Sequence, residues 1–125
     1  MRNKLSTLVV GMMLVGGTAY AGEVQWQVSV DRILTDSFNF GGCIVKVSPD
    51  PISQGLQCSK GGWVTFACDG SLSDAPAYAT SKSEAAQLYS SAQLAFITNA
   101  PMTVRATDDA QVDGYCVAFR TTNLK

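Results

Sequence analysis

The sequence predicts a mainly β domain with one helix, which is most compatible with a small five-stranded barrel. Three observations lead to this fold class. Apolar and polar residues alternate with a period of two in five separate segments. A segment with helical periodicity lies between the third and the fourth of them. Four cysteines in a chain of 125 residues suggest disulfides.

Residues 1–21 have the features of a secretory signal peptide. Arg2 and Lys4 precede the apolar run Leu5–Gly17, and the tripeptide Ala-Tyr-Ala that follows fits the small-x-small cleavage rule. The run is shorter than the roughly 20 residues that cross a bilayer as a helix. We therefore expect an exported single domain, residues 22–125, in the periplasm or outside the cell, without stable membrane insertion.

The first two strands are predicted from alternation. Residues 26–34 alternate with a break in phase near Asp31, which predicts a bulge. Residues 35–42 are polar and contain two glycines, as in a loop. Residues 43–48 form the second predicted strand, and the Pro-Asp-Pro sequence that follows stops it because proline cannot donate to a ladder.

A third strand is predicted within residues 56–68, with a bulge at Gly61 and Gly62. After a polar loop, Ser81 and Glu84 form a capping box that starts a helix. Asn99 suits the end of this helix. Its predicted core face consists of apolar residues at helical spacing: Ala85, Leu88, Tyr89, Ala92, Ala95 and Phe96.

Two further strands are predicted at residues 102–107 and 115–121, joined by a polar turn at residues 108–114. The order β-β-β-α-β-β is that of the OB-fold, a five-stranded Greek-key barrel. An open α+β sheet with the helix on one face has the same linear order and is the alternative. The barrel is favoured because closure removes exposed strand edges.

The four cysteines all lie in the exported part of the chain, and an even number there predicts two disulfides. Their spacing contains no C-x2-C pair, which argues against a structural zinc site. A hairpin of the second and third strands predicts the bond Cys43–Cys58. The third strand lies beside the fifth in such a barrel, which predicts the bond Cys68–Cys116.

Several classes of chemistry are excluded by composition. The chain has no histidine, so Ser-His-Asp and Cys-His nucleophile systems and histidine-based metalloproteases are ruled out. Asp108, Asp109 and Asp113 lie close together but lack calcium-loop spacing, and they are interpreted as a solvated hairpin turn rather than paired catalytic carboxylates. We therefore predict a protein that is not an enzyme and that has no cofactor or metal site.

The charge balance argues against nucleic acid as a partner. Without Arg2 and Lys4, seven of the nine basic residues remain against ten acidic ones. An OB-fold that binds nucleic acid needs a basic groove lined by aromatic residues.

The two tryptophans are interpreted differently. Trp26 lies in a regular alternation and is predicted to pack in the core. Trp63 follows the glycine pair in a polar stretch and is a candidate platform for a sugar, because an aromatic face offers an apolar stacking surface. The predicted ligand-binding residues are Trp63 with Asp36, Ser37 and Asn39.

The chain resembles the B subunits of certain AB-type toxins, those of subtilase cytotoxin and of pertussis-like typhoid toxin. The resemblance spans residues 33–105. The matching features are Cys43-Ile44, Cys58, Trp63, the helical Ala92-x-x-Ala95-Phe96 and the segment Pro101-Met102-Thr103-Val104-Arg105. It implies an exported OB-fold that binds host glycans, an enzymatic A subunit as a partner, and a homo-oligomeric ring of five.

In those subunits an aspartate and a serine before the first strand contribute to the sugar site. Here only residues 22–25 precede Trp26, and Phe96 or Ile97 stands where a site tyrosine would be. No site residue is therefore transferred from the toxins. A strip of small residues on the helix fits close packing between subunits: Ser83, Ala86, Ser90 and Ser91.

Two C-terminal patterns, Trp63-Val64-x-Phe66-x-Cys68-Asp69-Gly70 and the stretch around Gly114-Tyr115-Cys116, are more similar to small exported bacterial proteins. That second likeness implies no activity. We expect an exported, non-enzymatic binding module for glycans. The alternative is a structural or protein-interaction domain of the cell envelope.

Overall fold

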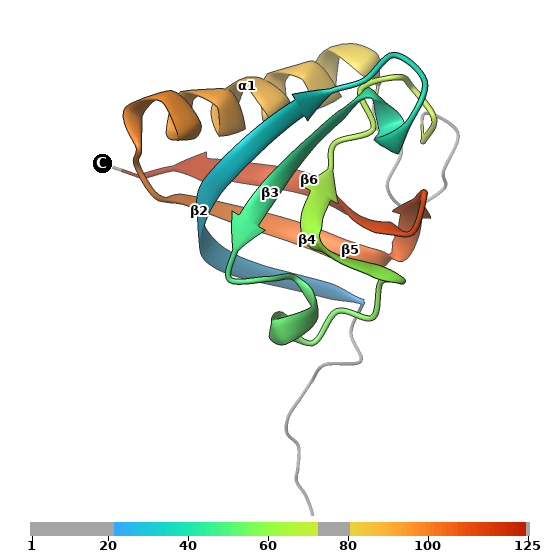
Figure 1. The fold of residues 1–125 in the computed structure, drawn as a ribbon, viewed down its shortest axis with the longest axis horizontal. Helices are drawn as coiled ribbons and strands as arrows, with labels where there is room; N and C mark the ends of the chain where they lie inside the picture. Colours follow the sequence, from blue (N-terminus) through green and yellow to red (C-terminus); the bar gives the residue numbers. More distant parts are fainter. Residues whose placement is uncertain (1–21, 73–80, 125) are drawn as a thin grey trace, which may run out of the picture.

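The strands and the helix follow one another in the expected order in the computed structural model, which describes residues 22–72 and 81–124 (Figure 1). Their bounds are β2 Glu23–Thr35, β3 Cys43–Ser48, β4 Lys60–Thr65, α1 Lys82–Thr98, β5 Met102–Val112 and β6 Tyr115–Asn123, with 3-10 turns η2 Phe40–Gly42 and η3 Ile52–Gln54. The predicted signal peptide lies outside the described residues. Within the described ranges, no helix is long and apolar enough to span a bilayer.

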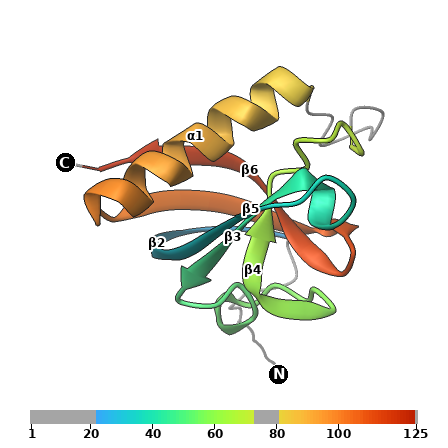
Figure 2. The same ribbon diagram turned by 45° about the horizontal axis from the view of Figure 1, so that its top comes forward.

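The strands close into a barrel in the order β2-β3-β4-β6-β5, and β5 pairs back onto β2. The β4–β6 pair is parallel, whereas the other pairs are antiparallel. With α1 between the third and fourth of these strands, this is the predicted OB-fold topology. The open-sheet alternative is wrong, because β2 and β5, the strands at the two ends of this order, pair with each other. The helix packs against β2 and β6 (Figures 1 and 2).

The core fills the barrel and continues under α1. Trp26 is only 8% exposed, and its indole Nε1 donates a 3.0 Å hydrogen bond to the Pro49 carbonyl oxygen. The prediction that Trp26 packs in the core is therefore confirmed. The side chains around it are mainly small or β-branched: Val28, Val45, Val47, Val64, Phe66, Ala92, Met102, Val104 and Ala106.

The first two strands, β2 and β3, agree closely with those predicted from the alternation of apolar and polar residues. The predicted bulge near Asp31 is present as a shift in the β2–β3 register between Val30 and Arg32. The second strand, β3, has the predicted bounds. The third strand is shorter than predicted at both ends. It begins at Lys60, and it ends before Ala67, whose φ of 55° is left-handed and turns the chain away from the sheet.

The hairpin of β5 and β6 is longer than predicted. Asp108 and Asp109 belong to β5 rather than to a turn. The turn itself consists of Asp113 and Gly114, with φ angles of 53° and 87°. Two consecutive positive φ angles are typical of the tight type I′ turn that Asp-Gly favours.

The helix is capped as the sequence predicts. Ser81 Oγ accepts a 3.1 Å hydrogen bond from the Glu84 amide, and Glu84 Oε1 accepts one of 3.0 Å from the Ser81 amide. Asn99 ends the helix in the left-handed conformation, with φ of 54°. Ala85, Tyr89, Ala92 and Ala95 are buried. The prediction that Phe96 lies on the core face is wrong: Phe96 is 39% exposed, because the packed face of α1 ends at Ala95.

The disulfides are Cys43–Cys68 and Cys58–Cys116, so the predicted pairing is wrong. The β3–β4 register explains the first bond. Ile44 lies opposite Thr65, and the Phe66 amide donates to the Cys43 carbonyl oxygen at 3.0 Å. Cys68 therefore follows just beyond the residue that faces Cys43. Cys58 lies before the start of β4, far from that end of the strand.

A bulge in β4 explains the second bond. Lys60 lies opposite Tyr115, whereas the next aligned pair is Val64 with Cys116, so the three residues between Lys60 and Val64 have no partner on β6. This extra length draws the preceding segment back toward β6, and the Cα atoms of Cys58 and Cys116 are 5.5 Å apart. Val64 lies opposite Cys116, and Cys68 is four residues past Val64. Along an extended chain this is roughly 13 Å, too far for a bond between Cys68 and Cys116.

Loss of either disulfide should destabilise the domain strongly. The bonds close loops with sequence separations of 25 and 58 residues. On the chain-entropy model, Cys43→Ala with Cys68→Ala costs about 3.5 kcal/mol, and Cys58→Ala with Cys116→Ala costs about 4 kcal/mol. Denaturant unfolding of the oxidised variants measures these costs. Peptide mapping without reduction checks the pairing directly, and a peptide joining Cys43 to Cys58 would contradict it.

Candidate functional site

An apolar hollow lies on the outer face of the barrel, between the β2–β3 loop (residues 36–42) and the β5–β6 turn. Five side chains line it, and we call it the aromatic hollow: Leu34, Phe40, Ile44, Trp63 and Tyr115. Its volume is about 120 Å³. Figures 1 and 2 place the β2–β3 loop and the β5–β6 turn on the same side of β4. In OB-folds, the face of the second and third strands between these two loops is where ligands bind.

Strand alternation turns these residues outward. Val45 and Val64 are paired in register, are fully buried and point into the core. Their neighbours Ile44 and Trp63 therefore point out of the barrel. Ile44 is nevertheless only 2% exposed, because the aromatic side chains around the hollow cover it. The face thus carries a second, small apolar cluster outside the main core.

Trp63 is half-buried and lies at the end of the β4 bulge. Tyr115 stands beside it as the first residue of β6. The Lys60 ammonium nitrogen is 5.4 Å from the centre of the Tyr115 ring, within the range of a cation–π contact. Two partly exposed aromatic rings and a cation therefore share one edge of the aromatic hollow.

The third ring of the aromatic hollow is that of Phe40, and hydrogen bonds to the Phe40 backbone fix its position. Phe40 has a φ of 62°, a conformation that costs free energy for a residue with a bulky side chain. Its amide donates to Asp113 Oδ2 at 2.7 Å, and its carbonyl oxygen accepts from Thr65 Oγ1 at 2.6 Å. These bonds fix the ring edge-on to Tyr115, with centroids 5.8 Å apart.

Gly41 lets the loop approach the barrel. A Cβ atom at this position would lie 2.7 Å from Thr65 Oγ1 and 2.9 Å from the Ala67 Cα atom, which is too close for any other residue. The Gly41 carbonyl oxygen also accepts a 3.0 Å bond from the Asp69 amide. The Cys43–Cys68 disulfide joins the same two segments. The loop is therefore pre-formed, which lowers the entropy cost of binding a ligand.

The predicted polar ligand residues have a different position. Asp36, Ser37 and Asn39 belong to the β2–β3 loop but do not line the aromatic hollow. Asp36 Oδ1 accepts from the amides of Phe38 at 2.8 Å and Asn39 at 3.0 Å, so its carboxylate shapes the loop. Ser37 and Asn39 are exposed at the surface. Their role in binding stays a prediction.

The structure joins Trp63 to this loop through Phe40, which the sequence reasoning missed. The sequence reasoning missed Tyr115 as well, because the alternation of residues 115–121 indicates only that Tyr115 belongs to a strand. The available signals were Phe40 directly before a glycine pair and Tyr115 directly after the Asp-Gly turn. An aromatic residue that borders a tight turn is well placed to present its ring at the end of a sheet.

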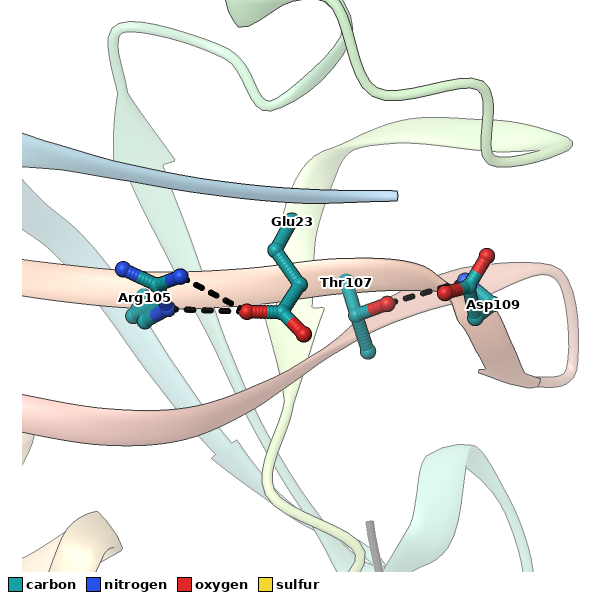
Figure 3. A network of polar contacts seen from close by, with 4 residues as sticks. All are labelled: Glu23, Arg105, Thr107 and Asp109. Carbon is teal, nitrogen blue, oxygen red and sulfur yellow. Dashed lines mark hydrogen bonds and ion pairs between the residues drawn. The ribbon is translucent and has the colours of Figure 1, made fainter. Parts of the chain in front are cut away.

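The clustered acids each have a separate structural contact. Asp108 Oδ2 accepts from the Gln57 amide at 2.6 Å, and Asp113 holds Phe40. The Asp109 amide donates to Thr107 Oγ1 at 3.0 Å (Figure 3). In residues 22–72 and 81–124, no group of three or more histidine, cysteine or acidic side chains is placed to hold a metal ion.

Comparison of the chain with protein-family models, with curated proteins and with solved structures gives no match.

The Asp36 carboxyl should titrate at low pH. The Phe38 amide, followed by the Asn39 contacts, lowers the pKa of Asp36 below its ordinary value of 3.8. Because the folded pKa is below the unfolded one, the contribution of Asp36 to loop stability is full above pH 3.8 and is lost as the pH falls through the folded pKa. NMR titration of the carboxyl carbon should give a midpoint below 3.8.

The same titration should move the Phe38 amide resonance, and Asp36→Ala should abolish that movement. An Asp36 midpoint at or above 3.8 would contradict the loop geometry.

Proposed function

We propose that this chain is an exported, non-enzymatic carbohydrate-binding module and that Trp63 in the aromatic hollow stacks against a sugar ring. The observation that carries the proposal is a half-buried tryptophan at a pre-formed apolar hollow on the ligand-binding face of an OB-fold. The C–H face of a sugar is apolar and fits flat against an indole.

The size of the hollow limits what enters it. Its volume of about 120 Å³ is well below the roughly 300–1,000 Å³ typical of sites that enclose a whole small molecule. A single apolar substituent of a sugar, such as the methyl of an acetyl group, fits in the hollow while the ring lies on Trp63. This mode of binding suits an extended glycan that lies on the surface.

Two further observations support the proposal. The disulfides are compatible with an oxidising periplasmic or extracellular location, where glycans are available. The sequence resemblance to glycan-binding toxin B subunits is consistent with the barrel topology. Host glycans as ligands and an enzymatic A subunit as a partner are part of this proposal.

Replacement of Trp63 should remove sugar binding while the fold stays intact. Loss of the stacking contact should cost about 1.4 kcal/mol or more, which corresponds to at least about tenfold weaker binding by Trp63→Ala. A glycan array identifies the best ligand, and calorimetric titration with it measures the affinity. Phe119→Ala on β6 is the matched control, because it also removes a half-buried aromatic ring but lies outside the hollow and outside α1.

Equal binding by Trp63→Ala and the unaltered protein would contradict the proposal. A folded protein that gives no response to any glycan on the array would also contradict it.

The helix surface favours a second candidate function, which is self-association or protein interaction. Leu94 and Ile97 on α1 are 53% and 76% exposed, and Phe96 between them in sequence is 39% exposed. Large exposed apolar side chains that lie together commonly mark an interface. The small residues Ser83, Ala86 and Ser90 are also exposed along the helix. We propose that a homo-oligomer, including a ring of five, forms through this surface.

Polar substitution of the helix surface should then dissociate the assembly. We expect Leu94→Ser with Ile97→Ser to reduce the mass measured by light scattering to that of one protomer. Ile52→Ser, at another apolar residue that is 41% exposed, should leave the mass unchanged. A single-protomer mass for the unaltered protein at tens of micromolar would remove this candidate.

A further inference from the structure

Two pairs of basic residues lie directly opposite each other on neighbouring strands. Arg105 of β5 is paired in register with Arg120 of β6, and Arg32 of β2 with Lys46 of β3. Side chains at such positions have Cβ atoms about 5 Å apart, so like charges there destabilise a sheet unless an anion lies between them.

The first pair has its anion within the chain. Glu23 Oε1 accepts hydrogen bonds from Arg105 Nε at 3.0 Å and from Nη2 at 2.7 Å (Figure 3). Both partners of this ion pair are about one-third exposed. The carboxylate thus offsets the charge of Arg105 beside Arg120, and the pair needs nothing from outside.

The second pair has no such carboxylate. Among the described residues, neither Arg32 nor Lys46 forms a salt bridge. The acid next to Arg32 in sequence is Asp31, and its Oδ2 atom accepts a hydrogen bond from the Ser48 hydroxyl at 2.5 Å. Two cations therefore remain side by side on the outer face of the barrel.

Arg32 and Lys46 lie in line with Trp63, the tryptophan of the aromatic hollow. Lys46 is paired in register with Trp63, so Arg32, Lys46 and Trp63 form one row across β2, β3 and β4, which we call the cationic row. All three face outward, because Val45 and Val64 beside them face inward. At about 4.8 Å between strands, Arg32 lies roughly 10 Å from Trp63.

We propose that the cationic row is an anion subsite and that the ligand is an acidic polysaccharide. One sugar stacks on Trp63, and a carboxylate or sulfate on a neighbouring sugar binds between Lys46 and Arg32. The planar guanidinium of Arg32 offers paired donors to either anion. This inference rests on the proposed function of the aromatic hollow and names the class of glycan that it takes.

Nucleic acid has the same combination of rings and negative charge, but the rest of the chain favours a polysaccharide. Acidic residues outnumber basic ones outside residues 1–21. The long-range field of the protein therefore repels a densely charged strand, while a local pair of cations still binds a sparsely charged polymer.

The test uses three polymers that share one backbone: dextran, carboxymethyl dextran and dextran sulfate, the last two with a low degree of substitution so that both are sparsely charged. An oligothymidine is the fourth probe. Binding to the oxidised protein is measured by calorimetry at physiological salt. We expect at least one acidic dextran to bind at least tenfold more tightly than dextran. Arg32→Gln with Lys46→Gln should remove this preference and leave any affinity for dextran unchanged.

The control is Arg120→Gln with Lys82→Gln, which removes the same charge from exposed residues outside the cationic row. An equal loss in this control would overturn the inference, because it would show a general charge effect. Equal binding of all three dextrans, or oligothymidine binding as tight as that of the acidic dextrans, would overturn it too.

The outcomes for the aromatic hollow and the cationic row are distinguishable. If Trp63→Ala keeps the full preference and affinity for acidic dextran, the stacking proposal fails and the anion subsite stands. If Trp63→Ala loses binding but the Arg32 and Lys46 variant keeps the preference, the subsite fails and stacking stands. No binding of either acidic dextran overturns the subsite.

Discussion

The offset pairing of β4 with β6 is the constraint on which the rest of the structure depends. These are the two strands that meet in parallel, and the bulge between Lys60 and Val64 sets how they align. The alignment closes the barrel, brings Cys58 to Cys116 and places Trp63 beside Tyr115. One local irregularity in a short strand therefore connects the stability of the fold to the geometry of the aromatic hollow.

The opposite side of the hollow is fixed by different means. The β2–β3 loop contains no regular strand, yet its backbone is bound on both sides of Phe40, to Asp113 and to Thr65. The Cys43–Cys68 disulfide closes the base of this region. Each disulfide thus stabilises one wall of the hollow. A binding surface in a domain of this size needs such support, because a small core leaves little free energy to hold loops in place.

Sequence reasoning predicted the elements because their signals are local. Alternation found the five strands, and the capping box of Ser81 and Glu84 defined the helix start. The prediction of the disulfide pairing failed because pairing depends on register over long separations, and three residues of β4 without a partner on β6 shift Cys58 along that strand. The hollow was found in part: Trp63 stood out as a residue type, whereas Phe40 reaches it through a left-handed backbone that no periodicity reveals.

The β2–β3 loop uses its residues in two distinct ways. Asp36, Phe40 and Gly41 support the loop through a carboxylate, a bound backbone and a close approach to the barrel. At the tip, Ser37 and Phe38 point into solvent, and Phe38 is 93% exposed. Side chains at the tip can therefore vary with little effect on folding, while they stand next to a fixed aromatic surface. Such a division makes the tip a place where descendants of one scaffold can acquire new binding preferences without rebuilding the barrel.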